Sequence, residues 1–256
     1  MKIFVINLER DMDRRLSIQS QLNKFEIPFE FEKGVLGSAI PKEELAVIYD
    51  KKKTFRNLCR ELTKAEIGCA ISHINVYKRI VEENIPYALI LEDDIIIPKQ
   101  LSMILKKIEP QIDPRKPDLF LLSRADNVKN KHEYIHPNIY PFYSENGAYS
   151  YIVTNFCAKI LLKAMFPICD VADCWPKLKK NKVIDIYAMN PPLFYPNELI
   201  FALSVGQTGR NEYKKLMGNM ILYKLCRAFW KPINYMTAFY NRIFNPYKGL
   251  YNDKRK

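Results

Sequence analysis

Three consecutive carboxylates, Glu92, Asp93 and Asp94, follow a hydrophobic stretch with the composition of a buried strand, residues 87–91. Because side chains alternate along an extended strand, we expect Glu92 and Asp94 on one side and Asp93 on the other. A hard divalent cation requires oxygen ligands and open coordination positions, and α/β sheets bind ligands at the carboxyl ends of their strands. The stretch is therefore a candidate metal site. The plain alternative is that the acids only solvate the end of a strand.

A second polar group follows the first predicted strand, residues 2–6. A helix over about 11–25 and a strand at 28–31 complete the opening of a parallel α/β sheet. The connection after the first strand is where such a sheet meets a base or a phosphate, and it carries Asn7, Arg10, Arg14 and Arg15. A planar guanidinium group matches phosphate oxygens, and we choose Arg14 as the candidate. The alternative is a solvated helix face.

The remaining elements continue the α/β pattern and predict one sheet flanked by helices. A capping box at Thr63–Glu66 opens a helix that runs to about residue 83, directly before the acidic stretch. Further strands are predicted at 118–122 and 147–154, the second followed by a helix. Residues 123–146 have no clear period and are predicted to form an irregular segment of the kind that borders binding sites.

Composition bounds the class of protein. With 256 residues, 48% hydrophobic and 27% charged, the chain is expected to fold around one substantial core. No apolar run approaches the roughly 20 residues that span a bilayer, and the first seven residues become polar too early for a signal peptide, so we expect a cytoplasmic protein. The six cysteines form no C-x-x-C pair, which favours free, mostly buried thiols.

The net charge of +12 is concentrated at the carboxyl end, where ten Lys and Arg but only two acids follow residue 210. We therefore predict a body over 1–210 and a basic tail over 211–256. On both sides of Pro232, apolar residues recur at helical spacing among basic ones, with Trp230 between them, as in helices that lie in a membrane interface. The alternative is a pair of helices packed on the body. A nucleic-acid partner is not expected, because the body carries little excess charge and no recognisable module.

Four stretches, in the same order, resemble the bacterial lipooligosaccharide glycosyltransferases of glycosyltransferase family 25, and the resemblance covers about residues 1–210. The stretches are 5–8 with 13–15, 62–73, 91–94, and 147–149 with the helix that follows. The resemblance implies a GT-A-type fold in which an acidic motif at a strand end holds Mn²⁺ or Mg²⁺ against the diphosphate of a sugar nucleotide. In this frame Asp94 is the expected metal ligand, Glu92 contacts the metal or the ribose, and Asp93 belongs to the same group.

The resemblance also implies a reaction: transfer of a hexose, most often galactose from UDP-galactose, with inversion to a β-linkage on a lipooligosaccharide sugar. UDP-glucose is the alternative donor. A protein of another class, one that binds sugar nucleotides or partners without turnover, is the rival. An acceptor attached to lipid favours a peripheral location on the inner face of the bacterial inner membrane, held by the basic tail.

Further site residues follow from the same resemblance. The acceptor hydroxyl requires a carboxylate base, for which Asp173 is preferred over Asp170, and Trp175 is placed to stack on a sugar face. Donor contacts are expected from Asn7, Arg14 and Arg210, the last from a loop that closes over the diphosphate. The wall of the site is expected to include four more residues: Glu66, Ser72, His73 and Tyr149.

Overall fold

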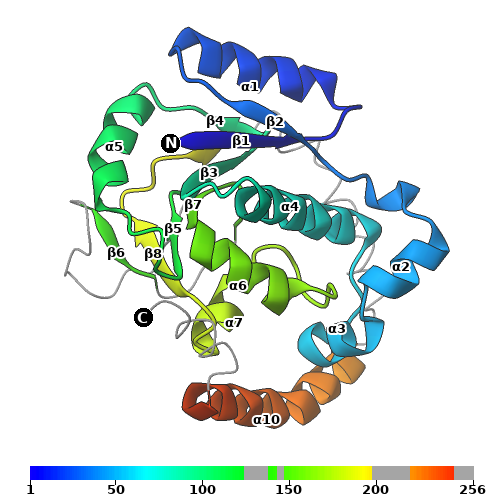
Figure 1. Ribbon diagram of the computed structural model, residues 1–256. Helices are drawn as coiled ribbons and strands as arrows, with labels where there is room; N and C mark the ends of the chain where they lie inside the picture. The colour runs from blue at the N-terminus through cyan, green and yellow to red at the C-terminus, as the bar shows by residue number, and fades with distance from the viewer. Residues whose placement is uncertain (124–137, 143–146, 198–219, 245–256) are drawn as a thin grey trace.

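The structure, a computed structural model, describes residues 1–123, 138–142, 147–197 and 220–244, and a seven-stranded sheet forms its centre (Figure 1). In spatial order the strands are β2 (Glu30–Lys33), β1 (Lys2–Asn7), β3 (Tyr87–Glu92), β7 (Ser150–Thr154), β5 (Asp118–Leu121), β8 (Asp185–Met189) and β6 (Ile139–Pro141). Strand β1 is parallel to both β2 and β3, as the sequence predicts, whereas β7 is antiparallel to both β3 and β5. The sheet is therefore mixed: the β2-β1-β3 part is parallel, β5 and β8 form a second parallel pair, and β7 runs antiparallel between the two parts.

Helices cover both faces of this sheet, which is why its central strands read as continuous hydrophobic runs. On one face α4 (Lys64–Glu82) and α6 (Asn155–Met165) pack over Phe4, Ile90 and Tyr151. On the other face α1 (Met12–Lys24) and α5 (Leu101–Ile108) pack over Val5, Leu89 and Ile152. Neighbouring residues of β1, β3 and β7 thus enter two separate cores, and the strands are fixed in register.

The first helix confirms the predicted span to within a residue, but only part of its predicted apolar side is buried. Ile18 and Leu22 are buried, whereas Leu16 is 58% exposed. The capping box before α4 is also confirmed: the Thr63 hydroxyl accepts from the Glu66 amide at 3.2 Å, and the Glu66 carboxylate accepts from the Thr63 amide at 2.8 Å.

A close backbone contact fastens the segment after β2 to α4. Gly37, which begins the short 3-10 helix η1 (Gly37–Ala39), packs against Gly68 of α4. Beside it the Ser72 hydroxyl donates to the Gly68 carbonyl at 2.7 Å and accepts from the Val35 amide at 2.8 Å. Two further helices, α2 (Lys42–Ile48) and α3 (Lys51–Leu58), connect this segment to α4. The Ser72 hydroxyl therefore links the helix to the loop.

Smaller elements complete the body. Strands β4 (Ile95–Ile96) and β9 (Tyr195–Pro196) form a second, antiparallel sheet. The 3-10 helix η2 (Glu109–Gln111) and helix α7 (Trp175–Lys180) lie elsewhere on the surface of the core. Strand β6 falls inside the segment predicted to be irregular, most of which lies outside the described residues. No disulfide joins Cys59, Cys69, Cys157, Cys169 and Cys174, and all of these except Cys69 are buried.

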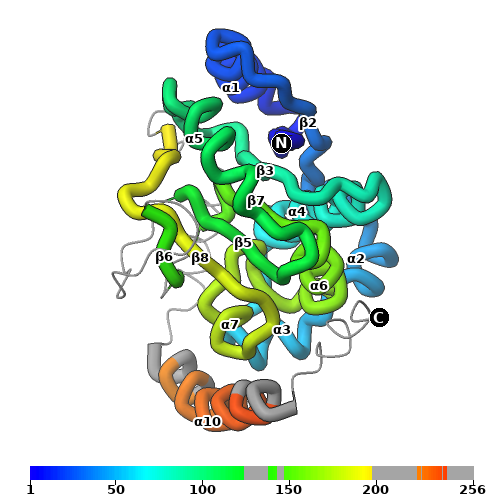
Figure 2. Tube along the Cα trace, turned by 60° about the vertical axis from the view of Figure 1, so that its left-hand side comes forward, coloured from blue at the N-terminus to red at the C-terminus, as the bar shows by residue number. Residues whose placement is uncertain are grey.

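The described part of the basic tail is one helix, α10 (Met220–Phe244), which continues through Pro232 instead of dividing there. It lies beside α3 and α7 in both views (Figures 1 and 2). The Asn234 side chain donates to the Arg56 carbonyl at 3.2 Å, and the Arg56 guanidinium lies 5.3 Å from the centre of the Trp230 ring. One side of the helix thus packs on the body. Residues 211–219 and 245–256, and the predicted boundary at 210, lie outside the described residues.

Candidate functional site

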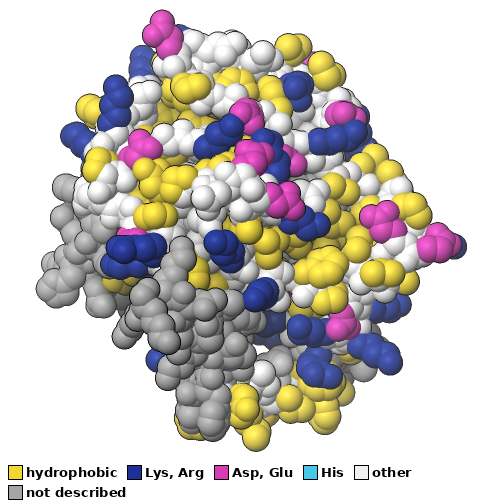
Figure 3. Space-filling model, in the orientation of Figure 1, with side chains coloured by type: hydrophobic (Ala, Val, Ile, Leu, Met, Phe, Trp, Pro, Cys, Tyr) yellow, Lys and Arg dark blue, Asp and Glu magenta, His cyan; other side chains and the backbone are white. Residues whose placement is uncertain are grey.

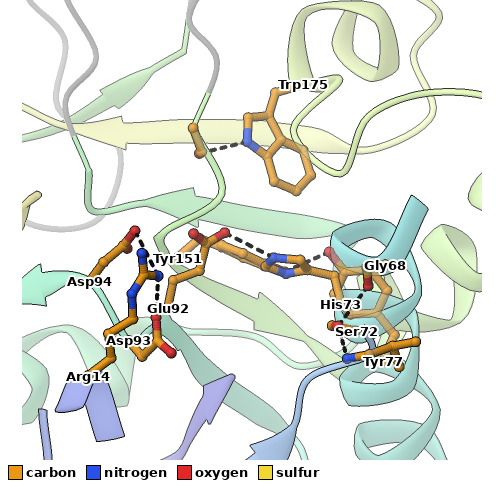
Figure 4. A network of polar contacts seen from close by, with 12 residues as sticks. Arg14, Gly68, Ser72, His73, Tyr77, Glu92, Asp93, Asp94, Tyr151 and Trp175 are labelled. Carbon is orange, nitrogen blue, oxygen red and sulfur yellow. Dashed lines mark hydrogen bonds and ion pairs between the residues drawn. The ribbon is translucent and has the colours of Figure 1, made fainter. Parts of the chain in front are cut away.

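The acidic stretch lies where strand pairing stops. Strand β3 ends at Glu92, and the chain turns at Asp93 and Asp94. The Arg14 guanidinium of α1 is 3.2 Å from Asp93 Oδ1 and 3.6 Å from Asp94 Oδ2, so the two aspartates share one arginine (Figure 4). The Glu92 carboxylate instead points toward His73. The charge of Glu92 nevertheless acts on Asp94 more than that of Asp93 does, so the predicted grouping of Glu92 with Asp94 is not contradicted, although Arg14 contacts both aspartates.

Asn7, the last residue of β1, forms a hydrogen bond with this acidic group. Its side-chain amide donates to Asp93 Oδ2 at 2.7 Å and to the Asp11 carbonyl at 3.3 Å. The side-chain carbonyl oxygen of Asn7 accepts from Arg15 at 3.4 Å, and the residue is only 2% exposed. Asn7 therefore holds Asp93 in place rather than facing a ligand directly.

The site concentrates negative charge in a poorly solvated place. Burial raises the pKa of Asp93, although Asn7 and Arg14 oppose the shift. Burial, together with the charges of Glu92 and Asp93, raises the pKa of Asp94 to about 7. Two carboxylates share a single guanidinium group and a third, Glu92, lies next to them in the chain, and carboxylate oxygens are the ligands that Mg²⁺ and Mn²⁺ prefer. The donor set thus fits a divalent cation, which would offset the excess negative charge.

The raised pKa of Asp94 predicts that stability depends on pH. In the folded protein Asp94 keeps its proton up to about pH 7, whereas the unfolded chain releases it near pH 4. Folding therefore loses free energy as the pH rises between these values, on the order of a few kcal/mol. We expect urea unfolding without divalent cations to show lower stability at pH 8 than at pH 5. The Asp94→Asn variant should lack this difference, and an equal slope in both proteins would contradict the assignment.

A chain of hydrogen bonds leads from Glu92 into the core (Figure 4). Glu92 Oε1 is 3.2 Å from His73 Nε2, and His73 Nδ1 is 2.7 Å from the Tyr151 hydroxyl. The Tyr151 hydroxyl is in turn 2.7 Å from that of Tyr77. His73 and both tyrosines are buried, while the Glu92 side chain is 29% exposed. This series of hydrogen bonds thus connects helix α4 and strand β7 to the partly exposed carboxylate of Glu92.

Cys69 completes a group that could hold a metal. Its sulfur, a His73 ring nitrogen and a Glu92 oxygen lie within 4.8 Å of one another, and this is the one such group found among the described residues. Cys69 lies in the stretch 62–73 that resembles the family, but it was not among the predicted site residues. The signal was its spacing: Cys69 and His73 are four residues apart, on one face of a helix.

The two predicted bases, Asp170 and Asp173, differ in their surroundings. The Asp170 carboxylate accepts from Lys177 Nζ at 2.8 Å and from the Val171 amide at 3.1 Å, which is the environment of a structural acid. The charge of Asp173, like that of Glu92, acts on the thiol of Cys69, an exposed residue.

The sugar-stacking role predicted for Trp175 is wrong. The residue has no exposed surface, and its indole N–H donates to the Gly147 carbonyl at 3.0 Å. Its ring meets the edge of Tyr151, with centroids 5.3 Å apart. An aromatic residue beside two acids resembles a sugar platform in sequence, but here the ring fills the core beneath the site.

The predicted wall residues have mainly structural contacts. The Glu66 carboxylate, besides its capping role, accepts from both terminal nitrogens of Arg60 at 2.6 and 2.8 Å. The backbone carbonyl of Tyr149 accepts from the Glu92 amide at 2.9 Å and so holds the end of β3. Arg210 lies outside the described residues.

A pocket of about 540 Å³ opens at the carboxyl ends of β1 and β2. Its walls are the residues after β1, the residues after β2, η1 with the start of α2, and one side chain of α4; they include Arg10, Lys33, Gly34, Glu44 and Asn75. Figure 3 shows acidic and basic side chains next to one another over this part of the sheet. Of these residues only Arg10 appears among the sequence candidates, because the walls come from segments far apart in the chain.

A pocket and an acidic group at the carboxyl ends of parallel strands define an α/β protein that binds a polar ligand at that edge of its sheet. Comparison of the sequence with known protein families identifies the class. A family profile described as glycosyltransferase family 25 (LPS biosynthesis protein) matches residues 1–175, and the chain belongs to this family.

Curated relatives come from bacteria and animals. The human procollagen galactosyltransferase 2 is 27% identical over 218 residues, which are 76% of this chain and 35% of that protein. A putative glycosyltransferase of Haemophilus influenzae is 31% identical over 189 residues, 72% of this chain and 59% of that protein. The lipooligosaccharide biosynthesis protein lic2B of the same species is 29% identical, covering 62% and 61%. The chain thus spans between one third and about three fifths of the length of these relatives.

Proposed function

We propose that the protein is a metal-dependent, inverting hexosyltransferase that transfers galactose from UDP-galactose, in β-linkage, to a sugar of a lipooligosaccharide. The observation that carries the proposal is the acidic group at the end of β3, next to β1 in the sheet, together with a pocket at the carboxyl ends of β1 and β2, in a chain of glycosyltransferase family 25. The relatives named for lipooligosaccharide biosynthesis and for galactosyl transfer support the acceptor and the sugar. UDP-glucose is the alternative donor.

In this proposal the pocket receives the nucleoside, and the diphosphate lies against the acidic group. Asp94 and Glu92, with Asp93 behind them, would hold the divalent cation, which when bound neutralises charge on the leaving diphosphate. Arg14 already lies against these carboxylates, and its planar donors suit a phosphate. Asp173, whose charge acts on Cys69, would take the proton of the acceptor hydroxyl.

The test is calorimetric titration of UDP, UDP-galactose and UDP-glucose into the full chain, with and without Mn²⁺, followed by a transfer assay on a truncated lipooligosaccharide. We expect binding that requires the cation, and a product extended by one hexose from the donor that binds more tightly. Binding without transfer would favour the non-catalytic rival. No binding under any condition would contradict the proposed function.

We also propose that the outward face of α10 lies on an anionic membrane surface, which would place the enzyme on the inner face of the inner membrane beside a lipid-linked acceptor. Exposed apolar residues recur along this face: Leu225, Phe229, Met236, Phe239 and Tyr240. Figure 3 shows hydrophobic side chains at the lower edge of the molecule, where α10 lies in Figure 1. Exposed Lys224, Arg227 and Lys231 accompany them. In the part of the chain that the structure describes, no helix is long and apolar enough to cross a membrane.

Charge placed on this face should release the protein from vesicles. Met236 and Phe239 are 70% and 59% exposed, so replacing both with glutamate removes apolar contact and adds repulsion from anionic headgroups. We expect cosedimentation with phosphatidylglycerol vesicles to weaken by at least about tenfold. Val47→Glu, at a residue 72% exposed on the body, is the matched control and should leave binding unchanged. Equal binding of both variants would contradict the membrane role.

A further inference from the structure

We propose that His73 is a positioning residue, held by Tyr151 and Tyr77, that fixes the Glu92 carboxylate in the geometry needed to bind the sugar-nucleotide donor. The inference rests on the proposed function. It adds a residue outside the acidic stretch, His73, that orients one of the carboxylates in it. Residues that orient a ligand-binding group from behind typically change affinity or activity by about 10–100-fold when they are replaced.

With a neutral imidazole, the hydrogen bonds among Glu92, His73, Tyr151 and Tyr77 are consistent in only one direction. Burial raises the pKa of both the Tyr77 and Tyr151 hydroxyls, so both keep their protons. A carboxylate only accepts, so His73 Nε2 must carry the proton that faces Glu92. His73 Nδ1 then accepts from the Tyr151 hydroxyl, which accepts from Tyr77 in turn. Every donor has an acceptor, and the imidazole has one tautomer and one orientation.

Glu92 depends on this support. The two aspartates after it are held by Arg14, whereas among the described residues His73 is the side chain that hydrogen-bonds the Glu92 carboxylate. The bond engages Oε1, and Oε2 remains for a ligand. The carboxylate is 29% exposed at the end of a strand, so without the imidazole it would rotate among several rotamers. The His73 ring is 1% exposed and cannot itself follow such a rotation.

Steady-state kinetics of the full chain separate positioning from folding. We expect His73→Leu to lower kcat/KM for the donor by about tenfold, through a higher donor KM, with the acceptor KM unchanged. His73→Gln, whose amide can donate to Glu92 in place of Nε2, should recover most of this loss. A loss of folded protein would lower the apparent kcat alone. Asn155→Ala is the structural control: it removes two buried hydrogen bonds, to the carbonyls of Ile80 and Ile85, far from the acidic group.

A double-mutant cycle tests whether His73 acts through Glu92. We expect Glu92→Gln to raise the donor KM, and the combination with His73→Leu to be no worse than Glu92→Gln alone, because two residues that act as one unit are not additive. Additive effects, or a His73→Leu enzyme with the donor KM of the wild type, would overturn the proposal. If the wild type neither binds nor transfers from a UDP-sugar, the proposed function itself fails, and that result is visible before any variant is compared.

Discussion

Replacing Asp94 with asparagine is expected to abolish Mn²⁺-dependent binding of UDP and to lower the rate of sugar transfer by at least about a hundredfold. The reason is electrostatic. The acidic group carries more negative charge than Arg14 can balance, and Asp94 is the member whose pKa rises to about 7. A bound divalent cation would remove that penalty, so the carboxylate and the cation stabilise one another. The amide keeps the shape of the side chain but not the charge.

The measurement is calorimetric titration of UDP with and without Mn²⁺, together with transfer rates at saturating donor. Asp113→Asn is the matched control, because its carboxylate pairs with Arg115 in an exposed loop after η2. That variant should bind UDP and transfer sugar like the wild type. If Asp94→Asn also retained cation-dependent binding, the acidic stretch would only solvate the end of β3, and the cation would have to bind elsewhere.

Local patterns explain which parts of the fold the sequence predicts. The strand at residues 2–6, the helix after it and the capped helix at 64–82 depend on neighbouring residues alone, and the structure confirms them. The position of β7 between β3 and β5 is different: it depends on pairing with residues 59 to 67 positions away in β3 and 30 to 34 positions away in β5, which no local period contains. The antiparallel direction of β7, which makes the sheet mixed, could therefore not be predicted from local sequence patterns.

The same distinction applies to the site. The acids and Arg14 were found because their types and positions after strands are informative, and the structure brings them into contact. The partners of His73 could not be found in this way, since Tyr151 is 78 residues away and reads as an ordinary core residue. Trp175 shows the opposite error: its sequence neighbours indicate a sugar platform, whereas long-range packing buries it. Residue type locates candidate chemistry, and contacts distant in sequence decide its orientation.

The contact between Gly68 and Gly37 predicts the second large effect, on stability and on the pocket together. A methyl group on Gly68 would lie 2.4 Å from the Val35 carbonyl oxygen and 2.6 Å from the Gly37 amide nitrogen, so backbone must move. We expect Gly68→Ala to lower the free energy of unfolding by about 3 kcal/mol. Val35 and Gly34 line the pocket beside this contact, so UDP affinity should also fall.

Urea unfolding and UDP titration of the same samples measure both consequences. Lys78→Ala is the matched control, because Lys78 is exposed on the same helix and alanine favours helix. It should change the free energy of unfolding by less than about 0.5 kcal/mol. If Gly68→Ala has the same free energy of unfolding as this control, α4 and η1 can move apart without loss of stability, and the prediction is wrong. If it is destabilised yet binds UDP with unchanged affinity, the nucleoside does not depend on the segment that Gly68 holds, and the pocket at the ends of β1 and β2 is not its site.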